Sequence, residues 1–367
     1  MPFDVHDFAG APAEDQAAGR HNRKVVAGWL FAICGMMLVM FVLGAATRLT
    51  GSGLSIMEWA PLRGVLPPWS DAEWQRLFAL YQTIPQFQLR NVGMDLAGFK
   101  GIFWLEWMHR LWGRLLGAAF AVPLLWFWLR GRIERRLRWR LALILALGGA
   151  QGGVGWFMVA SGFLPDSTAV APIRLVVHLG LAVLLYAAVL WTALAVLRPY
   201  PPPGVAAWRG VRWLCGGATG LLVLTILAGG FVAGTGAGRA YNTYPLMDGR
   251  IVPEGYASLA PMWRNLIENV AAVQFHHRLF ATMTLLVTLA ALLAGCWRAP
   301  AHPARVLLYV LAGVVLAQYA LGVATLLLVV PIDLAVAHQL LAVLALSAAM
   351  AALHALRPAR PTSAGAT

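Results

Sequence analysis

The stretch that organises the chain is Glu106-Trp107-Met108-His109-Arg110, which recurs as Gln274-Phe275-His276-His277-Arg278 at an offset of 168 residues. Three further matches occur in the same order along both halves, each at its own offset. They are Gly51-Ser52-Gly53 with Gly236-Ala237-Gly238 (offset 185), Gln151 and Gly155 with Gln318 and Gly322 (offset 167), and His178 with His338 (offset 160). Ordered matches of this kind predict an internal repeat, in which each half of the chain forms one structural unit.

The sequence around these motifs is strongly apolar. Hydrophobic residues make up 60% of the 367 residues and charged residues only 12%, whereas proteins average about 25% charged residues. A helix that crosses a membrane needs about 20 apolar residues. Eight runs of that length occur, near residues 25–47, 102–129, 141–160, 172–197, 211–233, 267–295, 305–330 and 332–356. The composition excludes soluble, disordered and fibrous proteins and predicts an all-α polytopic membrane protein with eight transmembrane helices.

The net charge of +13 is distributed unevenly between the two sides of the predicted membrane. The side that holds both termini carries 16 Lys and Arg and 5 acidic residues, while the other side carries 9 and 8. The positive-inside rule therefore places both termini in the cytoplasm. Because the basic excess is explained by topology, nucleic-acid binding is excluded as the reason for it.

Each half contains an even number of predicted helices, so both halves have the same orientation in the membrane. We expect two pseudo-symmetric four-helix bundles related by an axis roughly normal to the membrane. The Pro-rich stretch that begins at Pro199 is the natural joint between them. The expected segments are a cytoplasmic tail (1–24), an N-terminal bundle (25–198), a cytoplasmic linker (199–210), a C-terminal bundle (211–356) and a second cytoplasmic tail (357–367).

Four histidines lie at matching depths in the predicted helices: His109, His178, His277 and His338. Ionisable groups within a membrane usually mark function, and imidazole is a common axial ligand of haem iron. Two histidines in each half therefore predict one haem site per half. Histidines that only form hydrogen bonds between helices are the structural alternative. His276 adjoins His277 and points about 100° away from it, so we expect it beside the site or at the lipid interface.

The two halves differ at one position close to these histidines. Glu106 lies three residues before His109 and therefore on the same helix face, while its counterpart Gln274 cannot ionise. This asymmetry indicates that the first half is the reactive one and that the second half holds a permanent cofactor. The structural alternative is a carboxylate that is favoured near a helix start.

Arginines accompany the histidines in both halves. Arg110, Arg114 and Arg278 lie within about one helical turn of them, and guanidinium groups pair well with carboxylates such as haem propionates. Snorkelling of the arginine side chains to the membrane interface is the alternative. Three further arginines near the outer surface are weaker candidates for the same role: Arg48, Arg174 and Arg239.

In these residues the chain resembles the haem A synthase family. The resemblance rests on Gly44-Ala-Ala-Thr-Arg-Leu-Thr-Gly-Ser-Gly-Leu-Ser-Ile56, Phe103-Trp-Leu-Glu-Trp-Met-His-Arg-Leu-Trp-Gly-Arg114, Arg174-Leu-Val-Val-His-Leu-Gly-Leu-Ala182, Ala240-Tyr-Asn-Thr-Tyr-Pro-Leu-Met-Asp-Gly249, Gln274-Phe-His-His-Arg278 and Ala337-His-Gln339. These stretches extend over nearly the whole predicted membrane region. Taken together and in this order they are a specific signature, although Glu106-x-x-His109-Arg110 alone is only moderately so.

The resemblance implies an oxidoreductase that acts on a CH group and converts haem O to haem A by hydroxylation-type steps, for cytochrome c oxidase assembly. It implies a haem b cofactor between His277 and His338, and a substrate haem O whose iron lies near His109 and His178. It also implies that Glu106 is catalytic. The expected location is the inner membrane, with the haem sites towards the periplasm. Haem O synthase and an electron donor are the expected partners, and self-association into a homo-oligomer is left open.

One departure and two alternatives accompany this resemblance. Some bacterial members carry a cysteine pair in the first outer loop, whereas residues 48–101 here contain no cysteine, so no thiol role is carried over. A di-haem b-type electron-transfer cytochrome is the main alternative function, and it predicts haems at different depths. A transporter built from repeats would show inverted topology or broken helices, and the sequence indicates neither.

Overall fold

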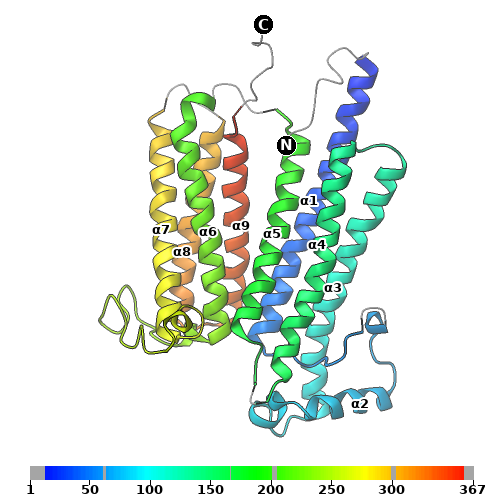
Figure 1. Ribbon diagram of the computed structural model, residues 1–367, viewed down its shortest axis with the longest axis vertical. Coiled ribbons are helices and arrows are strands. Elements are labelled where there is room, and N and C mark those ends of the chain that lie inside the picture. Colours follow the sequence, from blue (N-terminus) through cyan, green and yellow to red (C-terminus); the bar gives the residue numbers. More distant parts are fainter. Residues whose placement is uncertain (1–12, 61–62, 166, 201–204, 299–302, 359–367) are drawn as a thin grey trace.

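The computed structural model describes residues 13–60, 63–165, 167–200, 205–298 and 303–358 (Figure 1). Within these residues, eight helices are long and apolar enough to cross a membrane, which confirms the all-α polytopic fold with eight spans. They are α1 (Ala13–Leu49), α3 (Leu96–Leu129), α4 (Arg135–Val159), α5 (Pro172–Leu197), α6 (Arg209–Thr235), α7 (Val270–Cys296), α8 (Ala304–Leu327) and α9 (Ile332–Ala355).

Several helices extend beyond the apolar runs from which they were predicted. α1 begins at Ala13, so residues 13–24 of the predicted tail are helical, because Ala, Glu, Gln, Arg and Lys there are good helix formers. α3 begins at Leu96 instead of near residue 102, and the Asp95 side chain caps it by accepting the Gly98 amide at 2.8 Å. The predicted tails at 1–12 and 359–367, and residues 201–204 of the predicted linker, lie outside the described residues.

The first outer loop contains a helix that the apolar runs did not predict. α2 (Asp71–Gln82) is capped by Ser70, whose hydroxyl accepts the Glu73 amide at 3.2 Å. Its buried face packs onto the start of α3, where the Trp74 and Phe103 rings lie 4.8 Å apart. Two shorter segments complete the loop, the 3-10 turn η2 (Arg63–Val65) and the π-helical turn η3 (Gln86–Arg90). α2 therefore holds this loop against the outer end of the first half.

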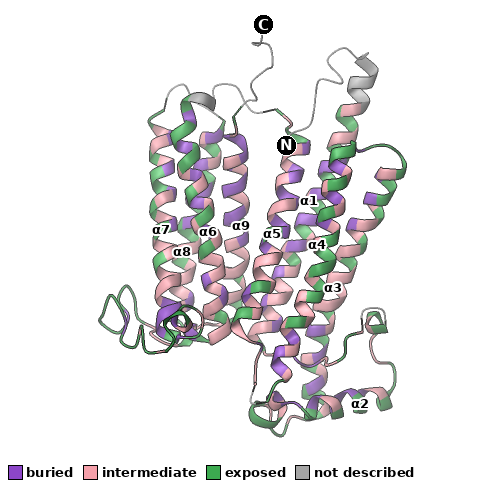
Figure 2. Ribbon diagram, in the orientation of Figure 1, coloured by how far each residue is buried: buried purple, intermediate pink, exposed green. Residues whose placement is uncertain are grey.

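The spanning helices form two rings of four. α1, α3, α4 and α5 contact one another in that cyclic order, and α6, α7, α8 and α9 do the same, so the two groups stand side by side in Figure 1. Figure 2 shows buried residues along α5 and α9, where the groups meet, and many exposed residues on α3 and α4. Exposed apolar side chains on such outer faces suit a lipid environment, since lipid is as apolar as they are.

The two rings share one apolar core. A continuous cluster of buried side chains includes Leu30 of α1, Val189 of α5 and Leu346 of α9. Hydrogen bonds also cross the boundary within the helices, among them Tyr186 with Ser347 at 2.7 Å and Gln339 to the Phe41 carbonyl at 3.1 Å. The halves are thereby joined into one unit along α1, α5, α6 and α9.

Candidate functional site

The four predicted histidines occupy equivalent places in the two rings. His109 on α3 and His178 on α5 belong to opposite helices of the first ring, and His277 on α7 and His338 on α9 belong to opposite helices of the second. All four lie in the half of each helix nearer the outer loops. The His277 and His338 rings lie edge to face, with their centroids 6.4 Å apart and their planes at 86°. The second ring therefore brings its two predicted ligands together.

A glycine on a neighbouring helix lies against each of these imidazoles. A Cβ atom at the glycine position would come within 3.2 Å or less of the histidine Cε1 atom in every case. The pairs and distances are Gly44 with His109 (3.2 Å), Gly155 with His178 (2.9 Å), Gly229 with His277 (3.0 Å) and Gly322 with His338 (2.7 Å). Glycine thus lets each imidazole pack directly against a helix backbone, and a larger residue would push the ring into the interior of the helix group.

The residues of the second ring fit a haem. Two metal–imidazole bonds of about 2 Å each, together with the radii of two imidazole rings, come close to the 6.4 Å between the His277 and His338 centroids. The His277 Nδ1 atom lies 3.0 Å from the Thr225 carbonyl, a contact that orients a ligating imidazole. Within the described residues, no three His, Cys, Asp or Glu side chains gather around one point. His277 and His338 lie as a pair, and these two imidazoles would hold the haem iron.

Glu106 is held by a dense set of hydrogen bonds. Its side chain is buried, with the residue only 2% exposed. Oε2 accepts the Ser55 hydroxyl at 2.7 Å and the Ile56 amide at 2.9 Å. Oε1 accepts Nη2 and Nε of Arg110 at 2.6 and 3.1 Å. Arg110 also donates to the carbonyls of Ile56 at 2.6 Å and Glu58 at 3.1 Å. The carboxylate and arginine together fix the outer loop over α3.

The second half repeats this arrangement with an amide in place of the carboxylate. Gln274 Nε2 donates to the Ala237 and Ala240 carbonyls at 2.7 and 2.5 Å, and its Oε1 accepts Arg278 Nη2 at 2.8 Å. Arg278 in turn donates to the carbonyls of Tyr241 at 2.6 Å and Thr243 at 2.9 Å. The backbone framework is equivalent in both halves, and the buried negative charge is present in only one of them.

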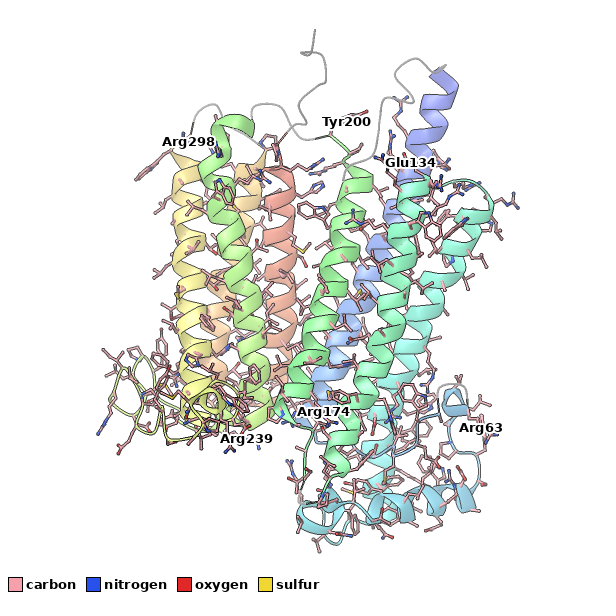
Figure 3. The ribbon with its side chains drawn as sticks, in the orientation of Figure 1. Arg63, Glu134, Arg174, Tyr200, Arg239 and Arg298 are labelled. Carbon is pink, nitrogen blue, oxygen red and sulfur yellow. The ribbon has the colours of Figure 1, made fainter. Side chains whose placement is uncertain are left out.

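Three of the other predicted arginines, Arg48, Arg114 and Arg174, hold backbone carbonyls at the outer ends of the helices. Arg114 donates to the Ala60 carbonyl at 2.9 Å. Arg48 donates to the Ala233 carbonyl at 2.7 Å, across the boundary between the halves. Arg174 donates to the Phe157 carbonyl at 2.9 Å and stacks on that ring. Figure 3 shows Arg174 and Arg239 at the same end of the molecule. Pairing of any of these arginines with a propionate stays a prediction.

Sequence reasoning missed several residues that shape the site. Ser55 and Ile56 bind Glu106 from about 50 positions away in the chain; both end the stretch Gly44–Ile56 quoted above, but nothing in that stretch assigns them to Glu106. The equivalence of Gly44 and Gly229 could have been predicted, because their positions differ by 185 residues, the same offset as that of the outer-loop glycine motifs. His276 bonds to the outer-loop residue Tyr256 at 2.7 Å, and this contact orients it to the loop.

Comparison with known proteins assigns the chain to a family. Residues 27–350 match the profile of a family described as cytochrome oxidase assembly protein, a range that reaches from α1 into α9 and includes every predicted site residue. A haem A synthase of Granulibacter bethesdensis is 58% identical over 330 residues, which cover 90% of this chain and 87% of the relative. The chain belongs to the haem A synthase family.

Other haem A synthases match over similar lengths. Haem A synthase 2 of Acidiphilium cryptum is 48% identical and covers 92% of this chain and 93% of its own. The haem A synthase of Rhodospirillum centenum is 49% identical, with 90% and 87% covered. Because these matches extend over nearly both whole chains, the resemblance holds for the haem A synthase fold as a whole and not for one half.

Proposed function

We propose that this protein is a haem A synthase, an oxidoreductase that converts a methyl group of haem O to a formyl group by hydroxylation-type steps. The observation that carries the proposal is the difference between Glu106 and Gln274. Both residues sit on the same arginine-and-loop framework, yet only the first half places a buried carboxylate three residues before its histidine. One half is thereby equipped for chemistry and the other for retention of a cofactor.

In this proposal the second half holds haem b through His277 and His338. When bound, the haem supplies one-electron redox chemistry. The contribution of the protein there is geometric: Gly229 and Gly322 let the imidazoles approach the neighbouring helices, and the Thr225 carbonyl fixes the His277 ring. The amide of Gln274 adds no charge beside this site.

In the first half, His109 and His178 position the iron of the substrate haem O, and Glu106 acts on the porphyrin methyl group. A fixed carboxylate at this place acts as a base or as an electrostatic stabiliser of the positive charge that develops at the methyl carbon in the transition state. Ser55 and the Ile56 amide hold its Oε2 atom, and Arg110 holds Oε1. The carboxylate therefore needs little reorganisation when charge develops, which is the source of its effect on rate.

The same proposal includes the membrane location of the protein, its partners and its contacts with the haem propionates. The protein lies in the inner membrane, with the sites towards the periplasm, because the basic excess marks the opposite face as cytoplasmic. Substrate comes from a haem O synthase. Because the conversion of a methyl to a formyl group removes four electrons and inserts an oxygen atom, the reaction also needs molecular oxygen as oxidant, with an electron donor that reduces it. Arg110, Arg114 and Arg278 lie close enough along their helices to meet propionates, and their pairing with them belongs to the proposal.

The test is to purify the protein, quantify its haems and incubate it with haem O, reductant and oxygen-containing buffer. We expect one retained haem b per chain and formation of haem A. Two stoichiometric haems b, with haem O neither bound nor converted, would favour the di-haem electron-transfer cytochrome instead. All four histidines lie towards the outer loops, which disfavours that cytochrome, since transfer across the membrane needs haems at different depths.

A further inference from the structure

His277 is held more firmly than its repeat counterpart His109. Nδ1 of His277 lies 3.0 Å from the Thr225 carbonyl of α6. Nδ1 of His109 is buried and has no hydrogen-bond partner among the residues that the structure describes. His109 also has the widest glycine contact of the four histidines, 3.2 Å from Cε1 to the Cβ position of Gly44. A neighbouring helix therefore fixes one of these two imidazoles and leaves the other without a hydrogen bond.

The carbonyl that could accept from the imidazole exists in both halves. In an α-helix the carbonyl of one residue points along the axis towards the residue four positions later, and a glycine at that later position exposes the carbonyl to a neighbouring helix. Thr225 lies four residues before Gly229 in α6. Met40 lies four residues before Gly44 in α1, and the repeat offset of 185 aligns the two pairs. The halves therefore differ in how closely the imidazole approaches this carbonyl.

The side chains between the helices explain the difference. In the second half, the small residues Thr225 of α6 and Thr284 of α7 face each other, and their hydroxyl groups form a hydrogen bond of 3.0 Å. The repeat offsets place Met40 and Leu116 at these positions in the first half. The Met40 Cε atom lies 3.4 Å from the Cβ position of Gly113 on α3. α6 and α7 accordingly pack together more extensively than α1 and α3 do, because the longer side chains hold α1 away from α3.

The hydrogen bonds that join α1 to α3 fit this wider spacing. Trp29 of α1 donates to the Ala119 carbonyl at 2.9 Å, and Trp112 of α3 donates to the Met36 carbonyl at 2.8 Å. An indole nitrogen lies farther from its own backbone than a threonine hydroxyl does. These bonds therefore connect the two helices without drawing their backbones together, as the threonine pair does in the second half.

A hydrogen bond at Nδ1 strengthens an imidazole that binds a metal through Nε2. Donation from Nδ1 to a carbonyl fixes the tautomer and the ring orientation, and it raises the basicity of the ligand. An imidazole without this bond is a weaker ligand and turns more freely. A cofactor that stays in place needs two lasting axial ligands, whereas binding of an oxidant at an iron needs an axial position that can open.

We propose that this difference divides the roles of the two histidines. His277 is a permanent ligand of the cofactor haem, and His109 is the exchangeable ligand of the substrate haem. The threonine pair of the second half and its counterparts Met40 and Leu116 are the positioning residues that set this division. Release of His109 opens a coordination position for the oxidant in the first half, while His178, with its closer glycine contact of 2.9 Å, stays bound. This inference rests on the proposed function.

The test exchanges the two pairs of residues between the halves. Thr225→Met with Thr284→Leu gives the second half the side chains of the first. Thr225→Val with Thr284→Val is the conservative variant, because valine is close to threonine in size and leaves the helix spacing as it is. Three measurements on the purified holoprotein report on His277 without turnover: the rate at which haem b passes to apomyoglobin, the midpoint potential of that haem, and its low-spin absorption bands.

We expect the Met and Leu variant to lose haem b at least about tenfold faster, since removal of the partner of a ligating histidine costs about 10–100-fold in metal affinity. The midpoint potential is expected to rise, because a less basic imidazole stabilises the ferric state less. A tenfold loss confined to that state corresponds to about 59 mV. The valine variant is expected to keep the wild-type release rate and potential.

Two results in the second half would overturn the proposal. One is an unchanged release rate and potential in a folded Met and Leu variant. The other is an equal change in the valine variant, because it would show that the size of these side chains does not set the strength of the ligand. Faster release without a rise in potential would count as the first result, since it would report damage to packing and not a weaker imidazole.

The reciprocal exchange tests the first half, and it does so even where the enlarged pair prevents folding. Met40→Thr with Leu116→Thr gives α1 and α3 the small pair. Val39→Thr with Leu115→Thr is the matched control, because these adjacent residues are 42% and 46% exposed and lie on the outer face. We expect haem O to leave the first site at least about tenfold more slowly in the exchange variant and at the wild-type rate in the control.

The outcomes separate this inference from the proposed function. Unaltered release of haem O in the variant with the small pair, from a protein whose wild type converts haem O to haem A, would refute the exchangeable role of His109 alone. Failure of the wild-type protein to convert haem O would refute the proposed function, while the release rate and potential of haem b would still report on His277.

Discussion

Replacing Glu106 by glutamine gives the first half the residue that the second half has at the same place. The change keeps the size and shape of the side chain but removes its charge. Oε1 can still accept from Arg110, as Gln274 Oε1 accepts from Arg278 at 2.8 Å. The new amide nitrogen, in contrast, lies where Oε2 now accepts the Ile56 amide at 2.9 Å, so two donors face each other. The Ser55 hydroxyl can rotate to accept, whereas the Ile56 amide cannot.

Glu106→Gln is expected to change the free energy of unfolding and the rate of haem A formation by separate amounts. A buried amide left without an acceptor costs about 1–3 kcal/mol, and this is the expected loss in the free energy of unfolding for Glu106→Gln. Loss of one preorganised group that stabilises transition-state charge lowers kcat by about 10²–10³-fold. We therefore expect a protein that still folds and retains its haem b but forms haem A at less than about a hundredth of the wild-type rate.

The assay is extraction and chromatographic separation of haems O and A from membranes of cells that express each variant, with the retained haem measured on purified protein. Ser55→Ala is the graded control, because it removes one of the bonds to Glu106 and leaves the carboxylate in place. It is expected to reduce haem A about tenfold. Wild-type amounts of haem A from Glu106→Gln, at equal protein levels, would refute the assignment of the carboxylate to the reaction.

Three further predictions concern the cofactor and the outer surface. His338→Ala is expected to abolish the visible absorbance of the retained haem b in purified protein while the chain remains in the membrane. Gly322→Ala adds a Cβ atom 2.7 Å from the His338 Cε1 atom, so haem retention is expected to fall several-fold, whereas Gly313→Ala, in open space, leaves it unchanged. Arg76 lowers the pKa of Glu58 through a hydrogen bond, so this pair adds stability above the usual carboxyl pKa of 4.5 and loses it as the pH falls. Both side chains are more than one-third exposed, so solvent screens the pair. Arg76→Ala is therefore expected to lower the free energy of unfolding at pH 7 by less than about 1 kcal/mol. Thermal unfolding of both proteins at several pH values measures this difference.

The membrane fold could be predicted because hydropathy and length decide it. Lipid leaves helices and closed barrels as the structures that can satisfy the backbone, and eight apolar runs then give eight helices. The boundaries were less accurate, since helices such as α1 extend into water on good helix formers that hydropathy does not detect. α2 was missed although a signal was present: Ser70 and Glu73 form a capping pattern, and apolar residues follow at helical spacing from Trp74.

The candidate site could be predicted in part, and the reason lies in the repeat. Matching positions in two halves distinguish His109 from an isolated buried histidine, and they expose the contrast between Glu106 and Gln274. The contacts of those residues could not be predicted, because contacts such as the hydrogen bond of Ser55 with Glu106 join distant parts of the chain. The roles of Arg110 and Arg278 in holding loop carbonyls also depend on the folded path of the loops.

The joint between the two rings has a mechanical consequence. A carrier that alternates its access rocks one repeat as a rigid body against the other about a central site. Here the hydrogen bonds of Tyr186 with Ser347 and of Gln339 with Phe41 cross the boundary, and one apolar core spans it. Rocking would break these bonds and open that core within the membrane. A large ligand therefore has to be exchanged within a single half while the distance between the two halves stays constant.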